Sequence, residues 1–148
     1  MDEALIERYN ETVGPDDMVL WMGDAFFHMS RKWMQMKLEK LNGRKILILG
    51  NHDGSRAKML DVGFEWVERE AFIEMAGKKV RLHHYSYYGK GGVPGKRNPK
   101  PQGEDVLIHG HTHSTRRVHE NMINVCVEAW DYRPIRKEVI ANLVRSIR

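Results

Sequence analysis

The chain has 148 residues, of which 41% are hydrophobic and 30% are charged, a composition typical of one globular domain spanning residues 1–148. No apolar run approaches the roughly 18 residues of a membrane-spanning helix, and the acidic N-terminus is unlike a secretory signal. The single cysteine, Cys126, excludes a disulfide framework and a cysteine-rich zinc site. We therefore expect a cytoplasmic protein with no membrane partner.

Charge and histidine are both unevenly distributed. Residues 1–77 carry ten Lys and Arg against fourteen Asp and Glu, whereas residues 78–148 carry fourteen against six. A basic surface near a site would favour an anionic ligand, although an ordinary solvated surface explains the same charges equally well. Six of the eight histidines form three short clusters, at His52, at His83-His84, and at His109, His111 and His113.

The first half of the chain alternates helix and strand patterns. Apolar residues at helical spacing predict a helix over 2–12, and the continuous apolar run 18–22 is typical of a strand buried on both faces. Ser30 is suited to cap a helix that ends at Leu41. The pattern then predicts a buried strand at 46–49, a short helix over 55–62 and a strand near 64–67.

After residue 70 the pattern changes to hairpins. Residues 71–76 and 79–84 flank Gly77-Lys78, which indicates a hairpin turn, and 106–109 predicts a strand. A second hairpin is expected over 116–119 and 122–127, and Pro134 opens a final amphipathic helix. The pattern as a whole favours an α/β fold with a mixed β-sheet flanked by helices.

Residues 89–103 match neither a helix nor a strand, and contain five Gly, three Pro and four basic residues. A loop of this length in a compact domain is usually either functional or disordered. The basic residues Lys90, Lys96, Arg97 and Lys100 are expected to form a mobile lid or to hold an anionic substrate.

Polar side chains follow four of the apolar segments. They are Asp24, Asn51-His52-Asp53, His83-His84, and the run His109-Gly-His111-Thr-His113. Because ligand sites of open α/β sheets lie at the carboxyl ends of strands, we expect these groups to meet in space. Carboxylate, amide and imidazole ligands suit manganese, iron or zinc better than copper(I) or an iron–sulfur cluster.

Each of these residues also has an ordinary structural interpretation. Asp24 alone could cap a helix, and Asn51-His52-Asp53 alone could form a simple turn. His111 and His113 share a face in extended backbone, which favours metal binding. We interpret His28 and His119 as surface or core histidines, and Cys126 as a core residue rather than a nucleophile.

The combination Gly23-Asp24, Gly50-Asn51-His52-Asp53, His84 and Gly110-His111-Thr112-His113 resembles the calcineurin-like metallophosphoesterase superfamily over about residues 17–130. The resemblance implies a sandwich of mixed β-sheets flanked by helices. It also implies two divalent metal ions, with manganese favoured over iron, zinc or nickel. The expected activity is hydrolysis of a phosphomonoester or phosphodiester by water that the two metals activate.

The resemblance further assigns residues to roles. Asp24 would bridge both metals, Asn51, His84 and His111 would complete the second metal site, and His113 would bind the first. His52 would contact the phosphate and protonate the leaving group. His83 is expected to be the member of its pair that binds no metal.

Two departures from the family pattern stand out. The family has an Asp-x-His motif on its first strand, and no Asp-x-His occurs in this sequence. We therefore expect an N-terminally incomplete fold with an incomplete first metal site, and a strand edge that favours a homo-oligomer. Many relatives also carry an acidic residue three places after the bridging Asp, where this chain has Phe27.

Two alternatives to an enzyme remain open at this level. One is a non-catalytic remnant that binds a metal or a nucleic acid through the basic half, which would make binding sensitive to salt. The other is an inert fragment that folds poorly. The phosphate ester substrate is not specified by the sequence, and a nucleotide or nucleic acid is among those it admits.

Overall fold

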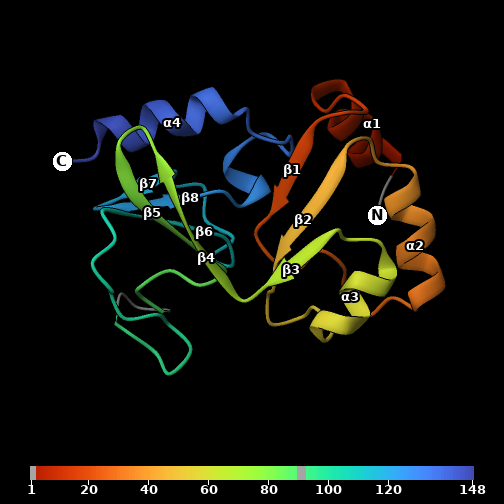
Figure 1. Cartoon of the computed structure of the whole chain (residues 1–148), viewed down its shortest axis with the longest axis horizontal. Helices are drawn as coiled ribbons and strands as arrows, with labels where there is room; N and C mark the ends of the chain where they lie inside the picture. Colours follow the sequence, from red (N-terminus) through yellow and green to blue (C-terminus); the bar gives the residue numbers. More distant parts are fainter. Residues whose placement is uncertain (1–2, 90–92) are drawn as a thin grey trace.

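The computed structural model describes residues 3–89 and 93–148. Within these residues it contains two β-sheets flanked by four α-helices (Figure 1), which confirms the predicted mixed α/β architecture. The helices are α1 (Glu3–Thr12), α2 (Arg31–Glu39), α3 (Arg56–Val62) and α4 (Lys137–Ser146), with a short 3-10 turn, η1 (Val127–Ala129), before α4. The strands are β1 (Met18–Trp21), β2 (Arg44–Ile48), β3 (Trp66–Glu68), β4 (Glu70–Met75), β5 (Lys78–His83), β6 (Val106–His109), β7 (Val118–His119) and β8 (Met122–Asn124).

The first sheet, sheet A, consists of β1, β2 and β3 in that order, and all of its strands are parallel. Parallel neighbours need a crossover connection, which α2 supplies between β1 and β2, and α3 between β2 and β3. A serine caps each helix: the hydroxyl of Ser30 accepts from the N–H of Trp33, as predicted, and that of Ser55 accepts from the N–H of Lys58.

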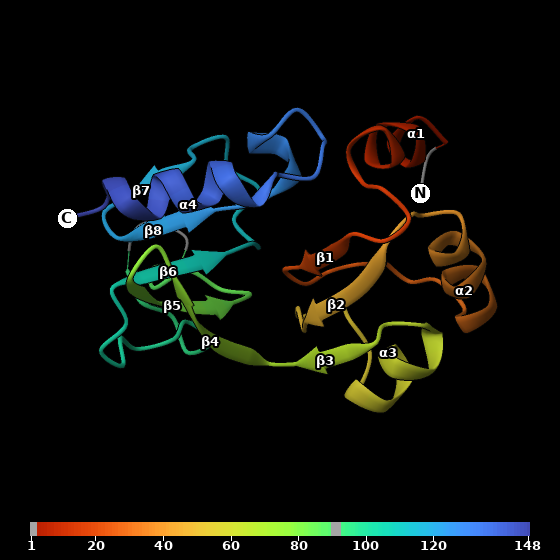
Figure 2. The ribbon, with the colours of Figure 1, turned by 45° about the horizontal axis from the view of Figure 1, so that its top comes forward.

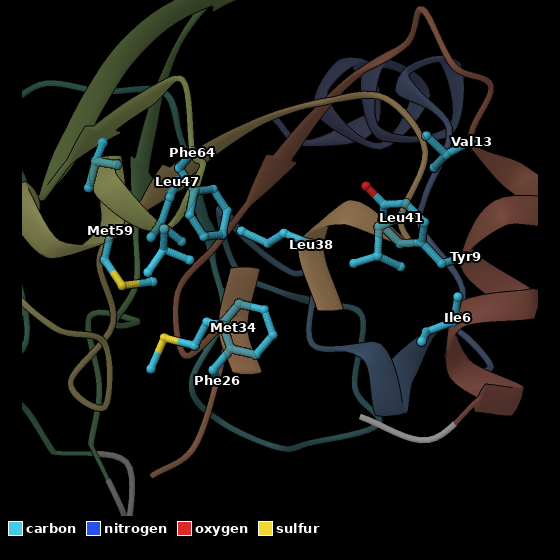
Figure 3. Packing of buried hydrophobic residues seen from close by; sticks show 12 residues of the cluster. Ile6, Tyr9, Val13, Phe26, Met34, Leu38, Leu41, Leu47, Met59 and Phe64 are labelled. Carbon is cyan, nitrogen blue, oxygen red and sulfur yellow. The ribbon is translucent and has the colours of Figure 1, made fainter. Parts of the chain in front are cut away.

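A hydrophobic core lies between sheet A and helices α1, α2 and α3 (Figure 3). Leu47 of β2 and Phe64, just before β3, meet Met34 and Leu38 of α2, all of them buried. These helices therefore cover one face of sheet A.

The second sheet, sheet B, is mixed and has the strand order β4-β5-β6-β8-β7. Its central strands β5, β6 and β8 are parallel, while β4 and β7 are antiparallel to their neighbours. The strand predicted at 106–109 is confirmed as β6, and all four of its residues are buried.

A second core joins the two sheets to α4. Ile48 of β2 belongs to the same buried cluster as Ile108 of β6 and Val144 of α4, and the half-buried Leu20 and Met22 pack against that cluster. Apolar packing between residues far apart in the sequence therefore holds the two sheets together.

The structure confirms the prediction for residues 18–22 in part. Val19 and Trp21 pack against the core under the helices, and Leu20 and Met22 pack against the core that joins the sheets, so both faces of β1 meet apolar side chains. The strand is nevertheless only half-buried, and its first residue, Met18, is 59% exposed. β1 is an outer strand of sheet A with a neighbour on one side, and the apolar run does not encode that position.

The two hairpins also differ from their predictions. The first turn lies at Ala76-Gly77 rather than Gly77-Lys78, because both Ala76 (φ 54°) and Gly77 (φ 74°) take the positive φ that a two-residue turn of this type needs. In the second, β8 ends at Asn124 instead of continuing to 127, since the Asn124 side chain accepts from the Cys126 N–H and bends the chain away. Cys126 therefore lies buried beside η1, not within a strand.

The segment 89–103 has no regular secondary structure in its described residues, as predicted. Its described part is attached to β5 and to the segment after it by polar contacts: Arg81 donates to the Lys100 carbonyl at 2.8 Å, and the Asn98 amide donates to the Ser86 carbonyl at 2.8 Å. Lys90, which the sequence assigns to the same basic set, lies outside the described residues.

Among the described residues, each helix falls short of the length and apolar character needed to cross a bilayer.

Candidate metal centre

The candidate site lies where strands of the two sheets end. Figure 2 shows the C-terminal ends of β1 and β2 facing those of β5 and β6 across the middle of the molecule. Asp24 follows β1 and Asn51 follows β2, both of sheet A, whereas His84 follows β5 and His111 follows β6, both of sheet B. The fold therefore brings together four side chains that the sequence separates by up to 87 positions.

His84 lies at the base of this site and is 1% exposed. Its Nε2 atom lies 3.1 Å from Oδ1 of Asn51, 3.2 Å from Nδ1 of His111 and 3.3 Å from Oδ2 of Asp24. Donor atoms of Asp24, His84 and His111 all lie within 4.8 Å of one another. Four potential ligand atoms therefore converge on one point.

The other ring nitrogen of His84 determines what these atoms can do. His84 Nδ1 lies 2.7 Å from the Met22 carbonyl oxygen, which can only accept, so Nδ1 carries the proton. In the neutral ring, Nε2 then presents a lone pair to the oxygens of Asn51 and Asp24. A proton on Nε2 could satisfy only one of these acceptors, whereas a metal ion would bind all of them.

The spacing of the four atoms fits a first-row divalent ion. Metal–ligand bonds to nitrogen and oxygen are about 2.0–2.2 Å, so adjacent ligands lie about 3.0 Å apart in an octahedron and about 3.4 Å apart in a tetrahedron. The three separations from His84 Nε2, 3.1, 3.2 and 3.3 Å, fall within this range. The residues present thus fit a metal ion by geometry and by donor chemistry.

Asp53 braces the two loops of sheet A that carry ligands. Its carboxylate accepts from the backbone N–H groups of Asp24 and Gly50 at 2.8 Å and of Ala25 at 2.9 Å. In return, Oδ1 of Asp24 accepts from the N–H of His52 at 2.8 Å. Each loop therefore fixes the position of the other.

Two glycines are required by this close approach. A Cβ atom on Gly50 would lie 2.2 Å from Oδ1 of Asp24, and one on Gly23 would lie 2.2 Å from Nδ1 of His84. Gly23 also has a φ of 94°, which side chains rarely adopt. Any larger residue at either position would displace a ligand atom.

The site opens to solvent on the side opposite His84, because Asn51 and His111 are exposed. The pKa of His111 is lowered, mainly by partial burial and further by the positive charge that His84 can carry, against the opposing effect of Asp24. A lowered pKa keeps the ring neutral near pH 7, the form that binds a metal. Catalytic metal sites keep a coordination position open to water or substrate, and the exposed side of this site would allow that.

His113, the expected ligand of the first metal, stands apart from this group. Its side chain is 62% exposed, and its Nδ1 lies 2.6 Å from Oε1 of Glu128. It is near enough for its charge to contribute to the lowered pKa of His111. Metal binding by His113 stays a prediction.

His52 lies on the solvent side of the site. Its ring lies against Phe27, with the ring centroids 4.5 Å apart and the planes tilted by 38°, and the ring centroid of His28 lies 6.4 Å away. Phe27 occupies the place where the resemblance leads us to expect an acidic residue, so in this chain His52 has an aromatic neighbour there.

The remaining histidines face elsewhere. His83 Nδ1 interacts with the backbone of Tyr85, and burial lowers its pKa. His109, the last residue of β6, is 5% exposed, with Nδ1 2.8 Å from the Gly110 carbonyl oxygen. His119 is on β7 and Cys126 is buried near η1, in keeping with the structural interpretation of both.

Sequence reasoning missed three parts of the site: the bracing role of Asp53, the Met22 carbonyl and Glu128. Asp53 was within a recognised motif, and its place two residues after Asn51 was a usable signal. The Met22 carbonyl and Glu128 carried no local signal, because each contacts a histidine from a different part of the chain.

Comparison with known families places the chain in one of them. The family model for the calcineurin-like phosphoesterase superfamily domain matches residues 2–127. The chain belongs to the calcineurin-like phosphoesterase superfamily.

Its relatives include phage and archaeal proteins. The Gene 66 protein of Mycobacterium phage L5 is 30% identical over 170 residues, covering 99% of this chain and 82% of the relative. An uncharacterized protein of Methanocaldococcus jannaschii is 28% identical over 158 residues, and the match covers 99% of this chain and 76% of that protein. The crystal structure of AQ665, a protein of unknown function from Aquifex aeolicus, superposes with a TM-score of 0.75 at 28% identity, covering 95% of this chain and 83% of the other.

Proposed function

We propose that the protein is a metal-dependent phosphoesterase that hydrolyses a phosphomonoester or a phosphodiester. Membership of the phosphoesterase superfamily supports the reaction class. The observation that carries the proposal is the arrangement around His84, where an imidazole nitrogen with its lone pair free lies 3.1–3.3 Å from three further ligand atoms. A divalent cation would satisfy all four of these atoms at once, whereas a single proton on Nε2 could satisfy only one acceptor.

In this proposal the side chains divide the work. Asn51, His84 and His111 hold the second metal and Asp24 bridges to the first, to which His113 is the further ligand. When bound, the divalent ions would lower the pKa of water and stabilise charge on the phosphoryl oxygens. His52, on the open side of the site, contacts the phosphate and donates a proton to the leaving oxygen.

We further propose that the two sites differ in strength. The second site has four ligands in this chain, Asp24, Asn51, His84 and His111, whereas the first has Asp24 and His113 alone among the residues assigned to it. Catalytic zinc sites typically use three protein ligands, so a site with two should bind weakly. Manganese is the favoured ion, with iron, zinc and nickel as alternatives.

The decisive experiment is hydrolysis of nitrophenyl phosphate mono- and diesters by the purified chain supplied with manganese. Turnover above the metal-free background is expected, and Asp24→Asn should abolish it while leaving the far-ultraviolet circular dichroism unchanged, because an amide cannot bridge two cations as a carboxylate does. Asp16→Asn, an exposed carboxylate outside the site, is the matched control.

Elemental analysis of the same preparation tests the difference between the sites. One tightly held metal per chain and a second that is lost on dialysis are expected, with low turnover. Two tightly held metals and rapid turnover would show that other residues complete the first site. Salt-sensitive nucleic-acid binding without metal-dependent turnover would instead favour the non-catalytic alternative.

A further inference from the structure

The pair His113 and Glu128 joins two segments that both follow strands of sheet B. His113 ends the run that begins at Gly110 after β6, and Glu128 lies in η1 after β8. His113 Nδ1 is 2.6 Å from Glu128 Oε1, within hydrogen-bond distance. Glu128 is 26% exposed and His113 is 62% exposed, so the carboxylate lies behind the ring and the ring faces solvent.

Both segments are clamped by one buried residue, Asn124. Its amide nitrogen donates to the carbonyls of Ser114 at 2.7 Å and Arg116 at 3.0 Å, while its amide oxygen accepts from the N–H of Cys126 at 2.9 Å. Asn124 is 4% exposed. The loop that carries His113 and the turn that carries Glu128 therefore share a rigid support.

Arg117 adds a second link between the same segments. Its Nε donates to the Ala129 carbonyl at 2.8 Å, and its guanidinium lies 4.2 Å from the centroid of the Trp130 ring. The Trp130 indole N–H in turn donates to the Asn124 carbonyl at 2.8 Å. These contacts hold η1 close to the loop that carries His113. The backbone of the two segments therefore places His113 and Glu128 within hydrogen-bond distance.

A carboxylate accepts hydrogen bonds and cannot donate them when ionised. Glu128 therefore holds the proton of a neutral His113 on Nδ1 and leaves Nε2 free, with the ring fixed in one orientation. The Met22 carbonyl holds the proton of His84 on Nδ1 in the same way. Metal-binding histidines commonly donate their second N–H to a carboxylate or carbonyl in this manner.

We infer that Glu128 is a positioning residue for the metal centre: it sets the tautomer of His113 and presents Nε2 of that ring as a ligand. The inference rests on the proposed function, and it adds a residue that none of the sequence motifs contains. It explains why a histidine exposed to solvent would still bind an ion in one geometry. Glu128 itself touches neither substrate nor reacting atoms in this assignment.

The tautomer is measurable on the full chain without any metal. Long-range proton–nitrogen correlation spectra of the histidine rings should show His113 protonated on Nδ1 in the wild type. In Glu128→Ala the spectrum should shift toward the Nε2-protonated form, and Glu128→Gln, whose amide oxygen can still accept, should largely restore the wild-type pattern. His119 serves as the internal reference, and Glu138→Ala, an exposed carboxylate on α4, as the matched variant.

Metal binding by the same variants, followed by titration calorimetry with manganese, supplies the second measurement. Glu128→Ala should weaken the weaker of the two binding events by roughly 10–100-fold and leave the tighter one unchanged. An unchanged His113 tautomer in Glu128→Ala, or equal manganese affinity in Glu128→Ala and wild type, would overturn the inference alone. A wild-type chain that takes up no metal would overturn the proposed function and this inference with it.

Discussion

Asp53 accepts a hydrogen bond from the backbone N–H of Asp24 at 2.8 Å, so one carboxylate fixes the backbone of another. The same Asp53 side chain also holds Ala25 and Gly50. The position of a metal ligand after β1 thus depends on a residue that follows β2 and binds no metal itself.

Replacing Asp53 should loosen the site without removing a ligand. Asn offers one acceptor oxygen where Asp offers two, and an amide N–H would face a backbone N–H. We expect Asp53→Asn to lower the free energy of unfolding by about 1–3 kcal/mol. Urea denaturation measures this loss, and manganese titration should show weaker binding at the tight site. Unaltered stability and affinity would contradict the bracing role.

His84 and His83 form a matched pair of neighbouring histidines, of which only one faces the ligand group. A ligand that binds the folded state alone stabilises it by about 2.7 kcal/mol at a concentration 100 times its dissociation constant. Manganese should therefore raise the melting temperature of the wild type and of His83→Ala, whereas His84→Ala should lose that increase. Loss of the increase in His83→Ala alone would reverse the assignment.

His52 should affect the rate and not the metal content. As a general acid it contributes roughly 10²–10⁴-fold to turnover. We expect His52→Gln to lower kcat by a factor in this range while elemental analysis finds wild-type metal. Because the His52 backbone N–H still reaches Asp24, the loop itself should remain in place. A metal-free variant would assign His52 to the ligands instead.

The basic loop yields a prediction about substrate binding. Neutralising Lys90, Lys96, Arg97 and Lys100 together should raise KM for anionic phosphate esters and leave the melting temperature nearly unchanged. The Lys100 contact with Arg81 runs through its backbone carbonyl, which the substitution keeps. If the variant and the wild type had the same KM for several anionic substrates, these charges would have no role in substrate binding.

A buried charge network under this loop predicts how stability depends on pH. Arg81 contacts Glu70 at 2.5 Å and Glu104 at 3.2 Å, and the Tyr87 hydroxyl donates to Glu104 at 2.6 Å. Burial acts to raise the pKa of Glu104, but the hydrogen bonds from Tyr87, the backbone and Arg81 outweigh it, so the pKa is lowered.

Because the folded pKa of Glu104 lies below its unfolded value of about 4.3, its contribution to stability is full above that value and disappears as the pH falls through the folded pKa. At pH 7, Glu104→Gln should therefore unfold at a lower urea concentration than the wild type, because its free energy of unfolding is about 1–3 kcal/mol smaller. This difference in free energy should shrink below pH 4. A difference that does not change with pH would mean that packing, not charge, explains the effect.

The sequence predicted what local pattern encodes. The helix cap at Ser30, the short helix near 55–62 and the strand at 106–109 were predicted correctly, because capping and apolar patterns are local properties. The histidines at the strand ends were also predicted from local pattern, because they directly follow apolar runs in the sequence.

What the sequence missed depends on contacts between distant segments. The exposure of Met18 follows from β1 being an edge strand, and the pairing of Glu128 with His113 follows from η1 folding back over the histidine loop. The one-residue shift of the first hairpin turn has a different cause: Ala76 accepts a positive φ, which its residue type did not suggest.

The division of the ligands between the two sheets has a mechanical consequence. Sheet A ends at Glu68 and sheet B begins at Glu70, so a single residue, Arg69, connects β3 to β4. An ion bound by Asp24 and Asn51 of sheet A and by His84 and His111 of sheet B would link the two sheets. Separating the sheets would then require breaking metal–ligand bonds, so a bound ion would limit how far sheet A and sheet B can move apart.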